Sequence, residues 1–331
     1  MTAEPKKQAI NPFDADAIRR EFPILSTKVH GKPLVYLDSA ASAQKPQCVL
    51  DALSSAYSET YANVHRGLHY LSEASTDAYE AVRGKVASLI NATDPAEVVF
   101  TSGATMSLNL IAHAYGNTYL SEGDEVLITV AEHHANIVPW HLLGDRVGSA
   151  TIAAPVNEDG SFDLDIFKSY ITERTKIIAI PHVSNVLGTV FPVSEIAALA
   201  HENGAICVVD GCQGVTHMPV NVNALGCDFY VFSGHKLYGP SGIGICWGRG
   251  DIWAELPPFM GGGDMIDDVE TDTSTYAHPP HRFEAGPPPI AETIGLGAAL
   301  DFVQSIGMEA LRDHEMDLLR YGHQRLAAVE G

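Results

Sequence analysis

The chain has 331 residues, of which 46% are hydrophobic and 18% charged, and its formal net charge is −21. This composition is typical of a soluble globular protein with one or two domains, and the acidic balance argues against nucleic acid or an anionic membrane as a partner. No hydrophobic signal region follows the first residues, and no apolar run is long enough to cross a bilayer. We therefore expect a cytoplasmic location.

Helical and strand patterns alternate along most of the chain. Helices are predicted near 14–21 and over 47–61, 72–90, 105–114, 135–143, 164–171 and 193–201. Strands are predicted over 33–38, 98–101, 126–130, 150–156, 177–180, 206–210, 229–232 and 243–247. Near-continuous Val/Ile runs separated by helices indicate an α/β fold with a mostly parallel sheet covered on both faces. The loops at the strand ends then share one edge, where α/β enzymes bind ligands.

The regular pattern stops at about residue 257. The stretch 257–289 is rich in Gly, Pro and Asp, and a loop of this length without regular structure is either functional or disordered. Helices are then predicted from about residue 292 to residue 329.

One lysine follows the most aromatic of the predicted strands. The run 229–232 leads directly into Ser233, Gly234, His235 and Lys236. A lysine held out of bulk water loses part of its preference for the charged form and forms Schiff bases with carbonyls, including the aldehyde of pyridoxal phosphate (PLP). Ser233 and His235 are suited to donate hydrogen bonds to a phosphate. A solvated loop lysine is the alternative interpretation of this stretch by itself.

Other polar residues follow the ends of neighbouring strands. The turn from Thr101 to Thr105 joins a strand to a helix and so offers an anion site. His133 is placed to lie over a flat ring, unless it is packed for structural reasons, and Asn185 offers a carboxamide. Asp210 directly follows a buried strand, where a carboxylate is costly unless it is paired. The pyridinium nitrogen of PLP is a fitting partner; capping of the next helix is the alternative.

Cysteine and histidine spacings give little support to a metal site. The five cysteines form no CxxC pair and no zinc-finger spacing, and four of them fall in or at the end of predicted core strands. Structural thiols in a reducing compartment are the favoured interpretation. The chain has fifteen histidines but no HExxH sequence, so we expect no metal site.

Six segments together resemble a known family. The segments are 37–42, 63–67, 132–140, 182–189, 232–239 and 282–286, with the sequences LDSAAS, NVHRG, EHHANIVPW, HVSNVLGT, FSGHKLYG and RFEAG. They resemble the SUF-system (group II) cysteine desulfurases, which overlap with selenocysteine lyases and belong to the class V aminotransferase group of fold-type I PLP enzymes. The resemblance runs from about Phe22 to the end of the chain.

The resemblance implies a PLP site and a homodimer. Lys236 would be the catalytic Schiff-base lysine, and His133 would stack on the cofactor ring and assist catalysis. Asp210 would pair with the ring nitrogen, while Asn185 and Gln213 would lie near the ring oxygen. The implied phosphate contacts are Ala104, Thr105, Ser233 and His235. Contacts to substrate or partner subunit would come from His65, Arg66 and Arg282, the substrate would be L-cysteine or L-selenocysteine, and a SUF sulfur-acceptor protein would be a partner.

Departures from the family pattern leave alternatives open. Met106 and Pro287 stand where the family has glutamate and threonine, and the chain stops at Gly331, before the expected persulfide cysteine and substrate-binding arginine. The expected division is 1–30 as an N-terminal part of a small domain, 31–290 as the PLP domain and 291–331 as the start of a truncated C-terminal domain. Another class V PLP reaction (aminotransferase, lyase or kynureninase-like) or an inactive truncated fragment remains an alternative.

Overall fold

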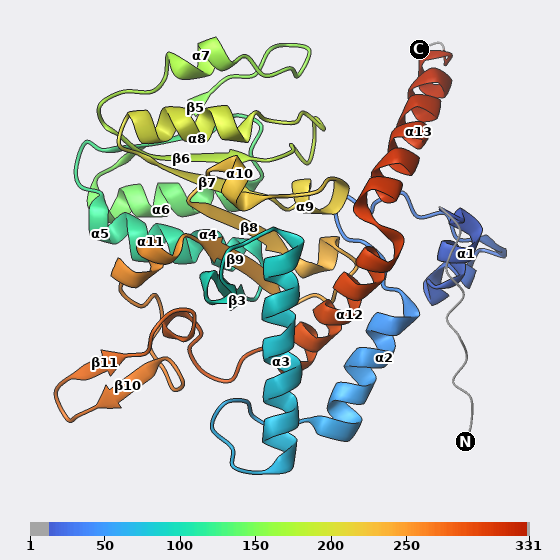
Figure 1. Cartoon of the computed structure of the whole chain (residues 1–331). Helices are drawn as coiled ribbons and strands as arrows, with labels where there is room; N and C mark the ends of the chain where they lie inside the picture. Colours follow the sequence, from blue (N-terminus) through green and yellow to red (C-terminus); the bar gives the residue numbers. More distant parts are fainter. Residues whose placement is uncertain (1–12, 330–331) are drawn as a thin grey trace.

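A seven-stranded sheet runs through the centre of the molecule (Figure 1). The structure is a computed structural model, and it describes residues 13–329. The strand order is β3-β9-β8-β7-β6-β4-β5. The strands are β3 (Val98–Thr101), β4 (Glu125–Thr129), β5 (Ala150–Ala154), β6 (Thr175–Pro181), β7 (Ile206–Asp210), β8 (Phe229–Ser233) and β9 (Gly244–Gly248). Two antiparallel hairpins lie outside the sheet: β1 (Lys28–Val29) with β2 (Lys32–Pro33), and β10 (Ile266–Val269) with β11 (Ser274–Tyr276).

The sheet is mostly parallel. Strands β5, β4, β6, β7 and β8 pair in parallel, and β9 pairs antiparallel with β8 and with β3. Every residue of β3, β4, β7, β8 and β9 is buried, as expected for a sheet that is covered on both faces. The ends of β6, β7 and β8 meet at one edge, because Pro181 pairs with Asp210 and Asp210 pairs with Val231.

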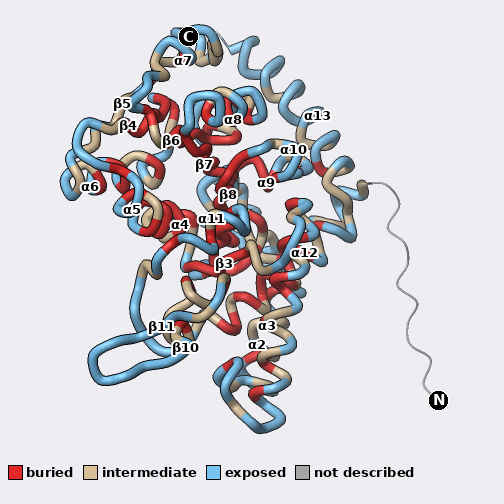
Figure 2. The backbone as a smooth tube through the Cα atoms, turned by 60° about the vertical axis from the view of Figure 1, so that its left-hand side comes forward, coloured by how far each residue is buried: buried red, intermediate tan, exposed pale blue. Residues whose placement is uncertain are grey.

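Helices cover both faces of the sheet. Figure 2 shows α4, α5 and α6 on one side of the strands and α8, α9 and α10 on the other. The α-helices are α1 (Ala15–Arg20), α2 (Gln47–Ser55), α3 (Tyr70–Leu89), α4 (Ala104–Ile111), α5 (Asn117–Tyr119), α6 (Val138–Val147), α7 (Leu164–Lys168), α8 (Val193–Glu202), α9 (Gly214–His217), α10 (Val222–Leu225), α11 (Gly250–Glu255), α12 (Ile290–Ile306) and α13 (Met308–Ala327). Shorter helical turns are η1 (Pro23–Ser26), η2 (Ala56–Thr60), η3 (Pro95–Glu97), η4 (Ala112–Gly116), η5 (His134–Asn136), η6 (Gly234–Lys236) and η7 (His281–Phe283).

Helices α2, α3 and α12 pack together beside the sheet (Figure 1). At Gly297 of α12 a Cβ would lie 2.7 Å from Val82 Cγ2 of α3, so the close approach of these helices needs a residue without a side chain. Helix α13 extends beyond this group and buries only Leu311. The ring of Phe13 stacks on His314 of α13 at 4.1 Å, which brings the beginning of the described chain beside its last helix.

The predicted fold class is confirmed, and one predicted strand is wrong. Strand β2 ends at Pro33, and residues 34–38 cross the surface without forming a strand. Leu34 still donates to the carbonyl of Thr27, but Val35 and Leu37 are 76% and 92% exposed. A run of apolar residues forms a strand only where a neighbouring strand satisfies its backbone groups, and this run has no such neighbour over residues 34–38.

The segment 257–289 is more ordered than its composition predicted. It contains the β10–β11 hairpin and the turn η7, although much of it remains irregular. The exposed hairpin projects from the body of the protein (Figures 1 and 2). An arginine ties this segment to the end of α11, since Arg282 donates to the carbonyls of Ala254 and Leu256 there and to that of Ala277 within the segment, at 2.9–3.0 Å.

Cysteine burial follows the strand pattern. Cys207, Cys212, Cys227 and Cys246 are buried, whereas Cys48 is exposed, and all five thiols are free.

Across residues 13–329 no single helix has the length and apolar composition to span a membrane. Helices α12 and α13 meet those criteria only as a pair, and this pair is bent by 75°.

Candidate active site

A cavity of about 380 Å³ lies at the sheet edge where β7 and β8 end. It is lined by Asp38, Ala40, Ala41, Ala104, Thr105, His133, Ala135, Asn185, Asp210, Cys212, Ser233, His235 and Lys236. Eight of the nine residues that were predicted to bind the cofactor are in this set. The structure therefore brings together an amine, imidazoles, carboxylates and a helix N-terminus from segments that are far apart in the sequence.

Lys236 reaches the cavity from η6, the turn that follows β8. Because β8 is buried along its whole length, the sheet fixes where this turn begins. The N–H groups of Leu237 and Gly239 both donate to the carbonyl of Gly234 at 3.0 Å and so close the turn. The half-buried amine is thus mounted on the core of the protein rather than on a long loop.

Asp210 presents a buried carboxylate at the end of β7. The residue is 7% exposed, and its Oδ1 accepts the N–H of Cys212 at 3.0 Å. Within the described residues no lysine, arginine or histidine forms an ion pair with it. A buried carboxylate without a cationic partner is costly, so this side chain is suited to a ligand that carries a positive group into the cavity.

The N-terminus of α4 forms the anion-binding end of the cavity. Ala104 donates its N–H to Ser233 Oγ at 2.9 Å, which joins the start of α4 to the end of β8. The preceding Gly103 has a φ of 155°, and a Cβ at Gly244 of β9 would lie only 2.3 Å from Gly103 Cα. This close packing positions the first turn of α4, whose free N–H groups and dipole favour an anion.

His133 enters the cavity directly before η5. Its Nδ1 accepts the N–H of Ala135 at 3.1 Å, which fixes the ring. Burial, reinforced by the charge of Lys236, lowers the pKa of His133 and favours a neutral imidazole. Asn185 also lines the cavity, from the exposed turn that follows β6.

Glu132 supports the His133 segment from behind and was not singled out from the sequence. Burial raises the pKa of Glu132 well above its usual range, and the nearby charge of Asp210 raises it further. The hydrogen bonds that Glu132 accepts act in the opposite direction but do not outweigh these effects. Asn136 donates to Glu132 Oε2 at 2.7 Å, and Trp140 Nε1 donates to Asn136 Oδ1 at 3.1 Å. The chain of contacts holds η5 against the sheet. An acidic residue shortly after the end of β4 was its only sequence signal.

Lys45 is a second lysine near the site that sequence reasoning missed. Its amine donates to the carbonyls of Ala43 and of His235, the latter at 3.1 Å. Burial lowers the pKa of Lys45 to about 8. Lys45 and His235 are 190 positions apart, so no local pattern signalled the contact. Lys45 braces the turn that carries Lys236, but it is not among the residues that line the cavity.

Four of the predicted site residues lie outside this cavity in the described chain. Gln213 lines a small neighbouring cavity together with Lys236, and its Nε2 donates to the carbonyl of Ala40 at 2.9 Å. Arg66 pairs with Asp264 at 2.6 Å, and His65 pairs with Glu80 at 2.9 Å. Arg282 binds the backbone carbonyls of its own region, as described above.

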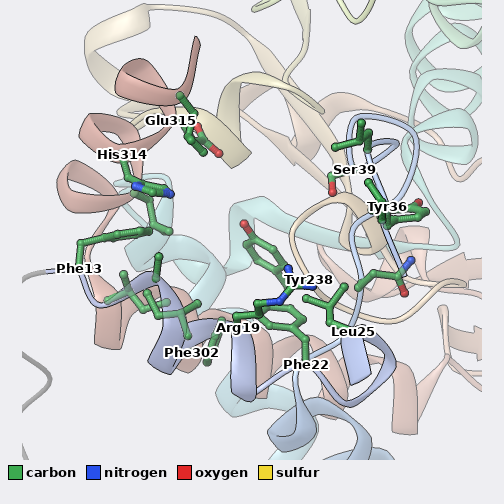
Figure 3. A pocket seen from close by; sticks show the side chains of 18 of the residues that line it. Phe13, Arg19, Phe22, Leu25, Tyr36, Ser39, Tyr238, Phe302, His314 and Glu315 are labelled. Atoms are coloured by element: carbon green, nitrogen blue, oxygen red, sulfur yellow. The ribbon is translucent and has the colours of Figure 1, made fainter. Parts of the chain in front are cut away.

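A larger apolar groove, of about 440 Å³, lies beside the N-terminal segment (Figure 3). Phe22, Tyr238 and Phe302 come together there, and the exposed segment 34–37 forms one wall. The cavity around Lys236 is the better candidate for an active site, because an amine, a buried carboxylate and a helix N-terminus converge there.

The fold and site define an α/β protein of a known enzyme class. The sequence profile of class-V aminotransferases matches residues 35–331. A cysteine desulfurase of Dickeya dadantii is 49% identical over 321 residues, which cover 97% of this chain and 78% of that protein.

Solved structures agree with this match. A cysteine desulfurase of Escherichia coli, CsdA, superposes with a TM-score of 0.88 at 38% identity, over 97% of this chain and 79% of that one. The apo cysteine desulfurase of Thermococcus onnurineus gives a TM-score of 0.89 at 35% identity, over 95% and 76% of the two chains. The chain therefore belongs to the cysteine desulfurases of the class V aminotransferase family, for which PLP is the typical cofactor.

Proposed function

We propose that this protein is a SUF-type cysteine desulfurase that binds PLP through Lys236 and removes sulfur from L-cysteine, leaving alanine. The observation that carries the proposal is the convergence of Lys236, Asp210 and the N-terminus of α4 on one cavity. An amine, a buried anion and an anion-binding helix end match the aldehyde, the pyridinium nitrogen and the phosphate of PLP, respectively.

The residues of the cavity fit this cofactor chemically. Asp210 is a buried carboxylate that lacks a cationic partner among the described residues, and a protonated ring nitrogen would supply one. Ala104, Thr105, Ser233 and His235 would hold the phosphate, with the first turn of α4 as the main source of N–H donors. When bound, PLP supplies an electron-withdrawing ring that stabilises negative charge at the substrate Cα.

Each remaining residue has a defined role in this proposal. The Lys236 amine would hold the cofactor and, when free, would be the base placed to take the proton from the substrate Cα. The neutral ring of His133 would lie against the cofactor and assist proton transfer there. Asn185 and Gln213 would contact the ring oxygen, which for Gln213 requires its amide to leave the carbonyl of Ala40.

The sulfur acceptor must be a thiolate, because the thiolate is the nucleophile. Cys212 is the one described cysteine that lines the cavity, and it is buried. Burial, assisted by the charge of Asp210, raises the pKa of the Cys212 thiol far above neutrality. We therefore propose that the acceptor cysteine and a carboxylate-binding arginine come from residues beyond Gly331, and that residues 1–331 alone are inactive in sulfur transfer.

The assembly and cellular context belong to the same proposal. We propose a cytoplasmic homodimer that passes sulfur to an acceptor protein for iron–sulfur cluster assembly, with His65, Arg66 and Arg282 near the partner subunit. L-Selenocysteine is a second substrate to test. We also propose the division into 1–30, 31–290 and 291–331, in which the first and last parts belong to one small domain.

Another class V PLP reaction is the competing function. An aminotransferase, a lyase or a kynureninase-like hydrolase would use the same lysine, aspartate and phosphate contacts. The competing idea predicts PLP binding with a different preference among amino acids, and the inactive-fragment idea predicts no turnover in any assay.

The test is a product assay on two polypeptides, one of residues 1–331 and one extended by the C-terminal segment of a relative that contains cysteine and arginine. Both are loaded with PLP and incubated with a panel of amino acids that includes L-cysteine. We expect both to bind PLP and only the extended protein to release alanine and sulfide from L-cysteine in the presence of a reductant. Turnover of other amino acids without sulfide release would refute the proposed reaction. Desulfuration by residues 1–331 that is lost in Cys212→Ser would make Cys212 the acceptor.

A further inference from the structure

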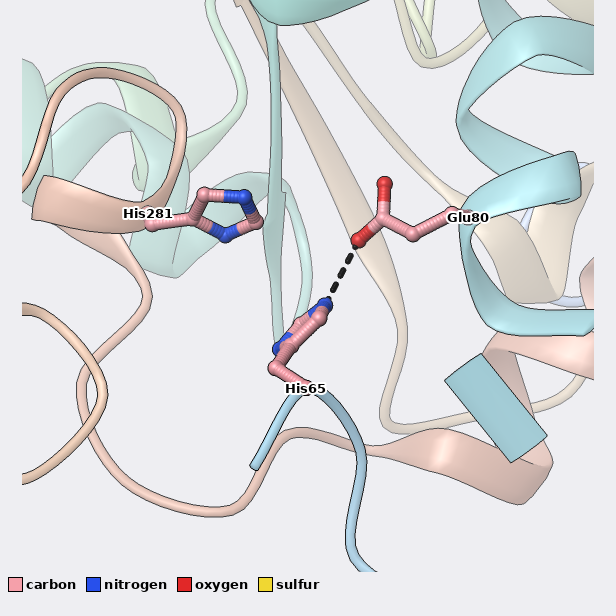
Figure 4. Close-up of side chains that lie close together, drawn as sticks. All are labelled: His65, Glu80 and His281. Atoms are coloured by element: carbon pink, nitrogen blue, oxygen red, sulfur yellow. Dashed lines mark hydrogen bonds and ion pairs between the residues drawn. The ribbon is translucent and has the colours of Figure 1, made fainter. Parts of the chain in front are cut away.

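Three metal-ligating side chains meet outside the active-site cavity. His65 lies in the loop before α3, Glu80 lies on α3 and His281 begins η7. One ligand atom from each lies within 4.8 Å of the other two, and His65 Nε2 is 2.9 Å from Glu80 Oε1. Figure 4 shows both imidazoles and the carboxylate directed toward a common space.

We propose that His65, Glu80 and His281 bind one divalent transition-metal ion, for which Zn²⁺ is the best fit. Two imidazoles and one carboxylate form a donor set that Zn²⁺ takes in proteins, with the fourth position left to water. Tetrahedral bonds of about 2.1 Å place the donor atoms about 3.4 Å apart. The present separations, from 2.9 Å to below 4.8 Å, bracket this value, so small side-chain rotations complete the site.

The surroundings of Glu80 prepare it as a ligand. Arg83 binds Glu80 through Nε–Oε2 at 2.7 Å and Nη2–Oε1 at 2.9 Å, and it also binds Glu284 at 2.8 Å. With both imidazoles neutral, two carboxylates and one guanidinium leave a net charge of −1 for a divalent cation. When a metal binds, Oε1 of Glu80 would exchange its hydrogen bond with His65 for a bond to the ion. Arg83 can meanwhile keep its bonds to Glu80 Oε2 and to Glu284. Arg83 therefore orients the Glu80 carboxylate in the way that outer partners orient the ligands of metal sites.

The backbone of His65 is held in position before any ion binds. His65 has a φ of 70°, in the left-handed region that a residue with a side chain rarely adopts, and its N–H donates to Thr76 Oγ1 at 2.9 Å. Its ring also meets that of His281 edge-on, with the centroids 4.9 Å apart.

Such an ion would join the irregular segment 257–289 to the body of the protein. His281 belongs to that segment, whereas Glu80 belongs to α3. Among the described residues, the ion pairs Arg66–Asp264 and Arg83–Glu284 already connect this part of the chain to the loop before α3 and to α3 itself. A metal–ligand bond is less sensitive to salt than these ion pairs, and so it would hold the segment firmly. The expected role is therefore structural.

Titration of the PLP-loaded chain with Zn²⁺, after removal of metal by a chelator, tests the site. We expect one saturable equivalent, with an affinity that falls about tenfold or more in His65→Gln and in His281→Gln. His323→Gln, which changes an exposed histidine of α13, is the matched control and should bind as the parent does. Zn²⁺ should also slow proteolysis within residues 257–289 in the parent and in the control, but not in His281→Gln.

A second measurement keeps the test decisive if a variant folds poorly. Co²⁺ in place of Zn²⁺ should give the intense visible absorption of a tetrahedral nitrogen and oxygen site in the unaltered chain. Failure to obtain a saturable Co²⁺ spectrum, or Zn²⁺ binding that both histidine variants retain in full, overturns the proposal. The second result would mean that the ion binds adventitiously to other histidines.

Discussion

The cavity around Lys236 and the cluster around Arg83 are held together by different forces. Backbone geometry positions the cavity, because Asp210 and Ser233 end neighbouring buried strands and Ala104 begins the helix beside them. Charge positions the cluster, because Arg83 pairs with Glu80 on its own helix α3 and with Glu284 of the irregular segment. Substitutions in the cavity should therefore change chemistry and leave the fold intact. Substitutions in the cluster should change stability first.

Loss of the cavity lysine should have the largest effect. Lys236→Ala removes the proposed covalent attachment of PLP and the base for the Cα proton, so turnover should fall below detection while the melting temperature stays close to that of the parent. Borohydride reduction followed by peptide mass mapping measures the attachment. Lys45→Ala is the matched control and should keep PLP attached, since Lys45 is partly buried nearby but does not line the cavity, and its amine donates to the backbone carbonyls of Ala43 and His235. A PLP adduct that survives in Lys236→Ala would refute the assignment.

Loss of the cluster arginine should have the next largest effect, on stability. The side chains of Arg83 and Glu284 are 4% and 5% exposed, so Arg83→Met leaves a buried carboxylate without its partner. We expect the free energy of unfolding to fall by about 3–5 kcal/mol. Lys85 lies on the same helix as Arg83, and Lys85→Met breaks its exposed pair with Asp301 of α12, which should cost at most about 1 kcal/mol. Urea unfolding measures the free energy of unfolding of both variants. Equal losses in Arg83→Met and Lys85→Met would contradict the greater importance of the buried ion pair.

Removal of the cavity carboxylate should weaken cofactor binding more modestly. Asp210→Ala removes a charge-assisted contact worth about 1.5–3 kcal/mol, so the dissociation constant for PLP should rise about tenfold or more. Asp210→Asn keeps the shape of the side chain but not its charge, and it should lose nearly as much. Equilibrium binding followed by PLP absorbance is the measurement. Full affinity in Asp210→Asn would show that the charge is not needed.

The smallest expected effect is a pH dependence of stability in the cluster. Burial opposes ionisation of Glu80, but hydrogen bonds from Arg83 and His65 outweigh it and lower its pKa from 4.5 to about 2. A lowered carboxyl pKa stabilises the folded state above pH 4.5, and this stabilisation is lost as the pH falls from 4.5 to about 2. Glu80→Gln should therefore lower stability at neutral pH and flatten this part of the profile. If the free energy of unfolding of Glu80→Gln changed with pH below 4.5 as steeply as that of the parent, Glu80 would not be the source of this pH dependence.

The sequence by itself determined the sheet and most of the cavity. Val/Ile runs that are too apolar for a solvated strand predicted buried parallel strands, and parallel strands necessarily end together. Residues shortly after those runs, such as Asp210, His133 and Lys236, are therefore expected along one edge of the sheet. The family resemblance added the roles of these residues, and the strand order β8-β7-β6-β4 in the structure brings them around one cavity.

Only the tertiary structure decided which side chains meet across long separations. His65 and Glu80 are 15 positions apart, and Arg83 and Glu284 are 201 apart, so no spacing in the sequence marks the cluster. The same holds for Lys45 beside His235, and for residues 34–38, whose apolar run has no partner strand to complete it. A local pattern fixes how a segment folds and which face it buries. The neighbour that it meets depends on how the whole chain packs.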